Sequence, residues 1–454
     1  MKRLAAYILI VIFTTISVVP AQESAEQEEL AKKVKEMQKE VSKICGKDFK
    51  KDVPVGVKDT EELKKFILEE MEKKSSDEEI IKSQKVIEKF GLLQKGTDLK
   101  KIFVDVCTEQ VAGLYDPEKK ELFLMKGKGF GAGAAEDDMA AAHELTHALQ
   151  DQYFDLLSFI RSVRNDDDES LAREALVEGE ATLLGFRYVL LKGERFTRER
   201  ADSALNKAPA IVRELLIFPY VRGALFCQQI LRRSGWKGFD SAFENPPLST
   251  EQILHPEKYF ETTDYPTALK MPELLKQFEG DWQLLDTNSL GEFVISVLVS
   301  QFLTAGDAKK ASEGWDGDKY QALEEKKTGK IVIAWVSTWD TKEDAQEFAK
   351  LYASVLAKKY NKKSEAAHNA SFIFISGDSE LACVESCGTE VIVVDSVSKA
   401  QLEKIRPELL KTVKVISNEQ KLDEFAKQPF SVPAPPAEES KKEPQKKPEH
   451  EREF

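Results

Sequence analysis

Apolar residues recur three and four positions apart over much of the chain, which is the spacing of amphipathic helices. Between about residues 26 and 93, Lys and Glu fill the positions between the apolar ones. Helices in this part are therefore expected to turn charged faces to solvent. The clearest predicted helices of the first 303 residues are 61–72, 78–92, 170–191, 201–233 and 290–303.

The pattern changes to that of strands over Gln110–Met125. Two apolar runs, Val111–Tyr115 and Glu121–Leu124, are separated by turn-forming residues at 116–120. The sequence therefore predicts two strands joined by this turn. A glycine-bearing loop follows over 127–133, and the alanine-rich stretch Met139–Gln150, which contains neither Gly nor Pro, predicts a helix.

The last third of the chain predicts a small α+β module. Its predicted strands are the apolar runs 331–336, 371–375 and 390–394, and its predicted helices are 342–360 and 399–411. Residues 306–317 are expected to be irregular. From about Pro429 onward Pro, Lys and Glu dominate, so the tail is expected to be disordered.

The N-terminus has the composition of an export signal. Lys2 and Arg3 precede the apolar run Leu4–Val19, and small residues follow before an expected cleavage at Gln22. The run is shorter than the roughly 20 residues of a membrane-spanning helix. We therefore expect an exported protein, periplasmic or extracellular, with no membrane span once the signal is removed. The alternative is an uncleaved N-terminal anchor.

Charge and cysteine content narrow the possibilities further. The chain has 66 Lys and Arg against 79 Asp and Glu, a net charge of −13. Nucleic-acid binding needs clustered cationic residues for the phosphates, so we expect no nucleic-acid partner. Of five cysteines, Cys383 and Cys387 are close in sequence, and we expect a disulfide between them in an oxidising compartment.

One pentapeptide, His143-Glu144-Leu145-Thr146-His147, has the residues and spacing of a hydrolytic zinc site. Residues four apart lie on one face of a helix, so both imidazoles can bind a single metal ion. Glu144 can then take a proton from a metal-bound water. The alternative interpretation is a helix that carries two surface histidines.

A catalytic zinc has three protein ligands and one open position, so a third ligand must come from another segment. Three acids, Glu174, Glu178 and Glu180, lie on the predicted helix 170–191. Glu174 and Glu178 share a helix face, while Glu180 points away from Glu178. Either of the first two can be the ligand, and a solvated acidic helix face is the alternative without chemistry.

With these motifs, the chain resembles the gluzincins, zinc peptidases in which two histidines and a glutamate bind the metal. More narrowly, it looks like the exported bacterial peptidase-MA-like group, whose glutamate lies in a Leu-x-Glu-Gly-x-Ala context, matched here by Leu176–Ala181. The resemblance covers about residues 110–188. It implies a zincin-like fold there, Zn2+ bound by His143, His147 and Glu178, and Glu144 as the general base.

Peptide hydrolysis also needs a donor for the oxyanion, and the resemblance implies a His or Tyr from a separate segment. His255 is our candidate, because the proline after it favours a helix end or loop from which a side chain can reach a cleft. Tyr259 and Tyr115 are alternatives, and a surface histidine is the interpretation without chemistry. Asp151, four residues after His147, is a candidate to orient that ring.

We therefore expect an exported zinc metallopeptidase that acts on a peptide or protein substrate. Two alternatives are a non-catalytic binding or scaffold protein on the same fold and a metal-dependent amidase with a non-peptide substrate. The expected fold class is α+β, with a mainly helical zincin-like domain that includes a short β-hairpin or sheet. The expected parts are a signal peptide (1–21), an N-terminal helical region (22–94), the catalytic domain (95–310), a C-terminal α+β module (311–426) and a disordered tail (427–454).

Overall fold

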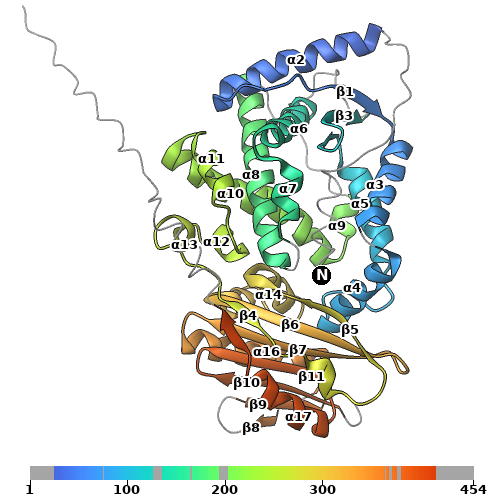
Figure 1. The fold of residues 1–454 in the computed structure, drawn as a ribbon, viewed down its shortest axis with the longest axis vertical. Coiled ribbons are helices and arrows are strands. Elements are labelled where there is room, and N and C mark those ends of the chain that lie inside the picture. The colour runs from blue at the N-terminus through green and yellow to red at the C-terminus, as the bar shows by residue number, and fades with distance from the viewer. Residues whose placement is uncertain are drawn as a thin grey trace, which may run out of the picture. The chain divides into compact units, whose positions relative to one another are not determined.

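The computed structural model describes residues 25–74, 76–125, 135–163, 166–193, 203–362, 365–367, 371–375 and 380–415. All of these lie in one compact unit, Met1–Asn418. The expected signal peptide, the glycine-bearing loop and the expected disordered tail fall outside the described residues. The fold class is α+β, as predicted, with a helical part and a separate large sheet (Figure 1).

Among the N-terminal helices, α4 shows most clearly how capping residues set the ends of a helix. The predicted helices 61–72 and 78–92 correspond to α3 (Thr60–Lys74) and α4 (Asp77–Phe90). Ser76 and Glu79 form a reciprocal capping box at the start of α4, and Gly91, with φ of 89°, ends it. The remaining helices of this part are α2 (Ala25–Cys45) and α5 (Leu99–Gln110).

The predicted strand pair is present as β2 (Gly113–Asp116) and β3 (Glu121–Met125), which are antiparallel. The turn between them forms because an Asp116 side-chain oxygen accepts hydrogen bonds from two backbone N–H groups, each at 3.0 Å. β1 (Val55–Lys58) pairs parallel with the other side of β3. The strand order β1-β3-β2 places β2 at an edge of this sheet.

Three long helices follow and pack together, α6 (Ala135–Phe154), α8 (Asp167–Leu191) and α10 (Ala210–Ser234), with the short α7 (Leu156–Arg161) between the first two. α8 and α10 approach closely because Gly179 faces Gly223. A Cβ added to Gly179 would lie 2.3 Å from the Gly223 carbonyl carbon, and one added to Gly223 would lie 2.1 Å from the Ala175 oxygen. The two backbones therefore meet with no side chain between them.

The single helix predicted for 201–233 is wrong at one point. The structure has a short α9 (Ala204–Lys207), an extended Ala208 and then α10. Pro209 explains the break, because it lacks an N–H and disfavours helical geometry in the residue before it. The short elements that follow α10 are α11 (Gly238–Glu244), α12 (Thr250–Leu254), α13 (Glu257–Phe260), β4 (Ala268–Lys270), which pairs with β12 (Val413–Val415), and the 3-10 helix η2 (Leu274–Gln277).

The C-terminal part is built on a seven-stranded sheet of order β5-β6-β7-β11-β10-β9-β8. Its strands are β5 (Trp282–Asn288), β6 (Trp315–Glu325), β7 (Lys330–Trp339), β8 (Glu365–Ala367), β9 (Ser371–Ile375), β10 (Leu381–Cys387) and β11 (Glu390–Val397). The predicted strands are β7, β9 and β11, and the predicted helices are α16 (Lys342–Lys359) and α17 (Lys399–Leu409). The irregular segment expected at 306–317 is wrong, because it forms α15 (Ala305–Ser312) and the start of β6.

The expected disulfide between Cys383 and Cys387 is also wrong, since both are free thiols. The two residues lie four positions apart in one strand, β10. An extended strand rises about 3.3 Å per residue, so their Cα atoms are separated by roughly 13 Å. A disulfide joins Cα atoms less than about 7 Å apart.

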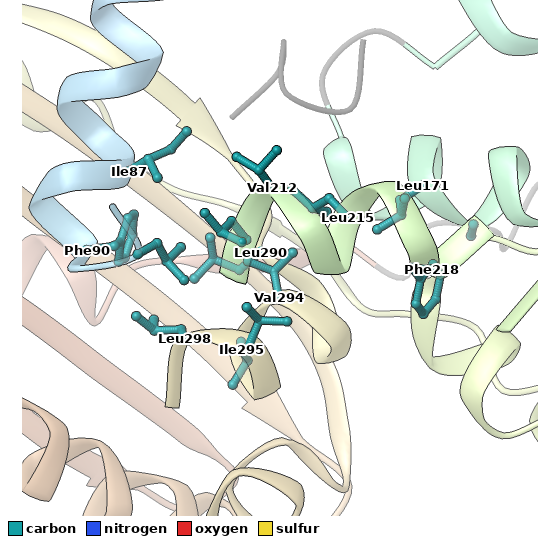
Figure 2. Packing of buried hydrophobic residues seen from close by; sticks show 14 of the residues in the cluster. Ile87, Phe90, Leu171, Val212, Leu215, Phe218, Leu290, Val294, Ile295 and Leu298 are labelled. Carbon is teal, nitrogen blue, oxygen red and sulfur yellow. The ribbon is translucent and has the colours of Figure 1, made fainter. Parts of the chain in front are cut away.

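The predicted apolar helix 290–303 is α14 (Gly291–Ser300), and it is core, as expected. Figure 2 shows Leu290, Val294 and Leu298 beside α4 side chains such as Phe90 and α10 side chains such as Val212. These residues belong to one buried cluster that also includes side chains of the large sheet. Among the described helices, none combines the length and the apolar character that a bilayer crossing requires.

Candidate metal centre

The pentapeptide lies in the middle of α6, and its two histidines face Glu178 of α8. His143 Nε2 and His147 Nε2 are 3.0 Å apart. Glu178 Oε2 lies 3.0 Å from the first of these atoms and 3.5 Å from the second. Two turns of α6 and one turn of α8 therefore bring three potential ligand atoms together.

The three atoms have the chemistry and spacing of a tetrahedral zinc site. With zinc–ligand bonds of about 2.0–2.1 Å, ligand atoms around a tetrahedral ion lie about 3.3 Å apart. The observed separations of 3.0–3.5 Å bracket that value. Two imidazoles and a carboxylate also suit zinc by ligand type. The donor set therefore fits the metal that the sequence predicts.

Within the described residues, a second group of acids also converges, but a lysine lies among them. The acids are Glu251, Asp264 and Asp340. Their carboxylates lie 2.6, 2.9 and 2.6 Å from the Lys258 Nζ atom. The ammonium group supplies the positive charge that these acids need, so we assign this cluster a structural role.

The electrostatics of the histidine pair favour an anionic Glu178. Burial opposes ionisation, but the neighbouring His147 and His143 outweigh it and lower the pKa of Glu178 to about 2. For His147, burial favours the neutral ring, but the Glu178 carboxylate raises its pKa to about 9. A metal ion that binds here must therefore displace a proton held between these groups.

Gln150 fixes the tautomer of His147. His147 Nδ1 lies 2.9 Å from Gln150 Oε1. The Gln150 amide nitrogen donates to the Val177 carbonyl at 3.0 Å and to Glu180 at 2.9 Å, so its oxygen must face the histidine. A neutral His147 then carries its proton on Nδ1, which leaves the Nε2 lone pair directed at the other two ligand atoms.

Asp151 does not take the role predicted for it. Its Oδ2 atom accepts hydrogen bonds from the Tyr115 hydroxyl and the Lys120 Nζ atom, both at 2.7 Å. These bonds attach α6 to the β2–β3 turn. The ring of His147 is oriented by Gln150 instead.

Glu144 lies between the histidine pair and the edge of β2. Its Oε2 atom accepts a hydrogen bond from the Tyr115 backbone N–H at 2.8 Å. Burial raises the pKa of Glu144, while the nearby histidines lower it. Gly113 gives the side chain room, because a Cβ at that position would lie 3.1 Å from Glu144 Cγ. The carboxylate is thus held in place by the strand that borders it.

Tyr220 is a candidate that the sequence did not reveal. Its ring stacks near His143, with centroids 5.9 Å apart and planes inclined by 24°. Burial and the carboxylates of Glu178 and Glu144 raise the pKa of its hydroxyl well above the usual range. The residue lies one turn before Gly223, so the close α8–α10 crossing sets its position. A single tyrosine within an apolar helical pattern carries no motif that marks it.

His255, the predicted oxyanion donor, makes different contacts. It ends α12, as the following proline suggested, but its Nε2 atom lies 3.0 Å from Glu292 of α14. This carboxylate raises the pKa of His255. Of the other residues considered, Tyr259 donates its hydroxyl to the Asn245 carbonyl at 2.6 Å, and Glu174 is buried but is not one of the three converging residues.

A cavity of about 890 Å³ opens beside the three ligand atoms. His143, Glu144 and Tyr220 line it on one side, and Gly113 of β2 lines it next to Glu144. The described lining residues do not include His147, Gln150 or His255. A substrate in the cavity can therefore reach Glu144 and His143, whereas His255 does not line this cavity.

Comparison with known proteins adds a match in a different part of the chain. A family model for a domain of unknown function (DUF8575) matches residues 282–406. The match begins at the first residue of β5 and ends within α17, so it covers the large sheet. No curated protein and no solved structure matches the chain. The matched domain does not include the candidate metal centre.

Proposed function

We propose that this protein is a zinc-dependent metallopeptidase of gluzincin type. One observation carries the proposal: His143, His147 and Glu178 direct three ligand atoms at one point, with the Glu144 carboxylate next to them at a cavity. A protein that only binds the metal would have no use for Glu144, so the presence of this carboxylate beside the ligands favours catalysis. The export signal expected from the sequence supports a site of action outside the cytoplasm.

The residues divide the chemistry among them. A zinc ion held by His143, His147 and Glu178 would lower the pKa of its bound water toward about 7 and polarise a carbonyl group. Glu144 takes the proton of the attacking water and returns it to the amine that leaves. Burial raises its pKa, which makes the carboxylate a stronger base for the first of these transfers. Tyr220, whose hydroxyl remains protonated, donates a hydrogen bond to the developing oxyanion.

The position of β2 favours a peptide as the substrate. Along this strand, peptide groups point alternately toward β3 and away from it. Ala112 accepts a bond from Met125 of β3, whereas the Tyr115 N–H faces Glu144. The peptide groups of Gly113 therefore share the outward side with Tyr115, next to the cavity. An extended chain can pair with this edge and so present a carbonyl beside Glu144.

The test combines metal analysis with proteolysis. We expect zinc in the purified wild type and in Glu144→Gln, but not in Glu178→Gln. Glu144→Gln should cleave peptides at least about a hundredfold more slowly, because it lacks the general base. Glu72→Gln, at an exposed position on α3, is the matched control and should behave as wild type.

Three results separate the alternatives. A wild type that binds no zinc, or a Glu144→Gln variant as active as the wild type, contradicts the proposal. A zinc-bound wild type that cleaves nothing in a broad peptide library supports the scaffold interpretation. Hydrolysis of small amides without peptide cleavage supports the amidase.

A further inference from the structure

The cavity beside the candidate centre is far more apolar than hydrolysis requires. Among the described residues that line it, Glu144 is the one carboxylate, and there is no Lys or Arg. Most of the wall comes from aliphatic and aromatic side chains of α5, α8 and α10, of which Val106, Leu183, Leu216 and Ile217 are examples. Such a wall provides no partner for a charged side chain of a ligand. It selects apolar groups.

The apolar surface continues from the cavity to its mouth. Phe186 of α8 and Val221 and Leu225 of α10 line the cavity and are 40%, 52% and 52% exposed. Leu190 and Leu191, at the end of α8, are 63% and 62% exposed. Single exposed apolar side chains are ordinary, but neighbouring ones at the rim of a cavity indicate a binding surface.

The size of the cavity indicates an occupant larger than one side chain. Sites that hold drug-sized ligands measure about 300–1,000 Å³, and the volume of about 890 Å³ lies near the top of that range. The outward peptide groups of Gly113 add a feature that an acyl chain cannot use, because they offer both a hydrogen-bond donor and an acceptor. An extended polypeptide can satisfy both.

We propose that this cavity binds polypeptide segments with two or more consecutive large apolar side chains, as an unfolded chain exposes. The claim that such segments are cleaved rests on the proposed function, whereas their binding does not. The binding residues proposed here are Leu225 and Val221 at the rim, Ala224 in the wall and Gly113 at the strand edge. The specificity follows from burial of apolar surface.

Binding can be measured in full-length Glu144→Gln, which isolates recognition from turnover. The probes are a fluorescent octapeptide with a central Leu-Phe-Leu, the same peptide with Ala-Ser-Ala, and neutral phosphatidylcholine vesicles. We expect the apolar peptide to bind at least about tenfold more tightly than its alanine counterpart. Adding Leu225→Lys should weaken the apolar peptide about tenfold, because it places a charge at the rim.

Two further variants keep the test decisive. Ile81→Lys, on α4, replaces an aliphatic side chain of matched exposure, 54% against 52% for Leu225, and should leave binding unchanged. Ala224→Phe fills part of the cavity without adding charge and should also weaken the apolar peptide. Circular dichroism of each variant tests its fold.

Equal binding of the two peptides, or equal effects of Leu225→Lys and Ile81→Lys, overturns the proposal. Vesicles that compete with the peptide and lose affinity in Leu225→Lys reassign the cavity to lipid and also overturn it. If the protein proves to hold no zinc but the peptide pattern is as expected, the binding site stands and the peptidase proposal falls.

Discussion

His147 owes its orientation to a neighbour one turn away on α6. Gln150 accepts a hydrogen bond from Nδ1 while α8 holds its own amide nitrogen, so the ring cannot rotate without losing a bond to a fixed partner. Removing such a partner typically costs 10–100-fold in metal affinity. We therefore expect Gln150→Leu to bind zinc about 10–100-fold more weakly than wild type, as measured by competition with a chromophoric chelator.

Gln152 on the same helix provides the control. Its side chain bonds to the backbone of Lys50 and Lys51 and has no bond to the histidines. Gln152→Leu should keep wild-type zinc affinity even if it loosens that segment. Equal affinities for Gln150→Leu and wild type would show that the glutamine does not position the ring.

Sequence reasoning named the residues of the candidate site that share a motif, and it missed those that only packing brings beside them. The histidine pair and Glu144 follow from helical spacing, and the choice of Glu178 over Glu174 follows from a short motif. Asp151 and Gln150 are both near His147 along the helix, and only the position of β2 and α8 decides between them. Asp151 is taken by Tyr115 and Lys120.

At the scale of elements, the crossing of α8 and α10 determines where Glu178 and Tyr220 lie. The crossing depends on Gly223, whose added Cβ would lie 2.1 Å from the Ala175 carbonyl oxygen. The obstacle is backbone, so the helices must separate to accept it. We expect Gly223→Ala to lower the free energy of unfolding by about 2–3 kcal/mol in urea denaturation.

A second helical glycine shows that the effect is not one of glycine replacement itself. Gly306 lies in α15, and the side-chain atom nearest to its added Cβ, Thr304 Oγ1, would be 3.8 Å away. Gly306→Ala should be neutral or slightly stabilising, since alanine favours the helix. Equal stability of Gly223→Ala and wild type would mean that the crossing adjusts at little cost.

Helices were predictable where capping residues agreed with the periodicity of the apolar residues. A strand was missed where its buried polar residues depend on partners from other parts of the chain. α3, α4 and α16 combine helical periodicity with capping residues, which in α3 are Asp59 and Glu62. β6 was missed because it carries buried polar residues such as Asp318 and Glu324, which hide its apolar alternation. Asp318 accepts hydrogen bonds from Trp315, three residues away, but also from Trp335 and from the backbone N–H groups at the start of α14, which are distant in the sequence.

At the scale of the whole molecule, a buried carboxylate joins the N-terminal helices to the large sheet. Asp395 of β11 lies 2.8 Å from Lys359 of α16 and 3.6 Å from Lys89 of α4, and accepts the Tyr360 hydroxyl at 2.5 Å. Asp395 is only 2% exposed. Burial alone would raise its pKa, but the two ammonium groups hold the pKa well below its usual range.

This pairing makes a definite prediction for acid stability. An acid whose pKa is depressed by folding stabilises the native state above its unfolded pKa of about 3.9, and this contribution is lost as the pH falls further. Asp395→Asn leaves Lys359 and Lys89 buried without their anion. We expect it to lower the free energy of unfolding at pH 7 by about 3–5 kcal/mol. The difference from wild type should shrink steadily below about pH 4.

Urea denaturation across pH 7 to 2 distinguishes this network from an ordinary ion pair. Asp281, 71% exposed at its side chain, pairs with Lys326 at 2.8 Å on the surface. Asp281→Asn should change stability by less than about 1 kcal/mol at any pH, because solvent screens the pair. A stability loss in Asp395→Asn that stays constant from pH 7 to 2 would mean that its carboxylate acts through packing. A loss that fades in acid, with no change in the surface variant, would show that charge on Asp395 joins the N-terminal helices to the sheet.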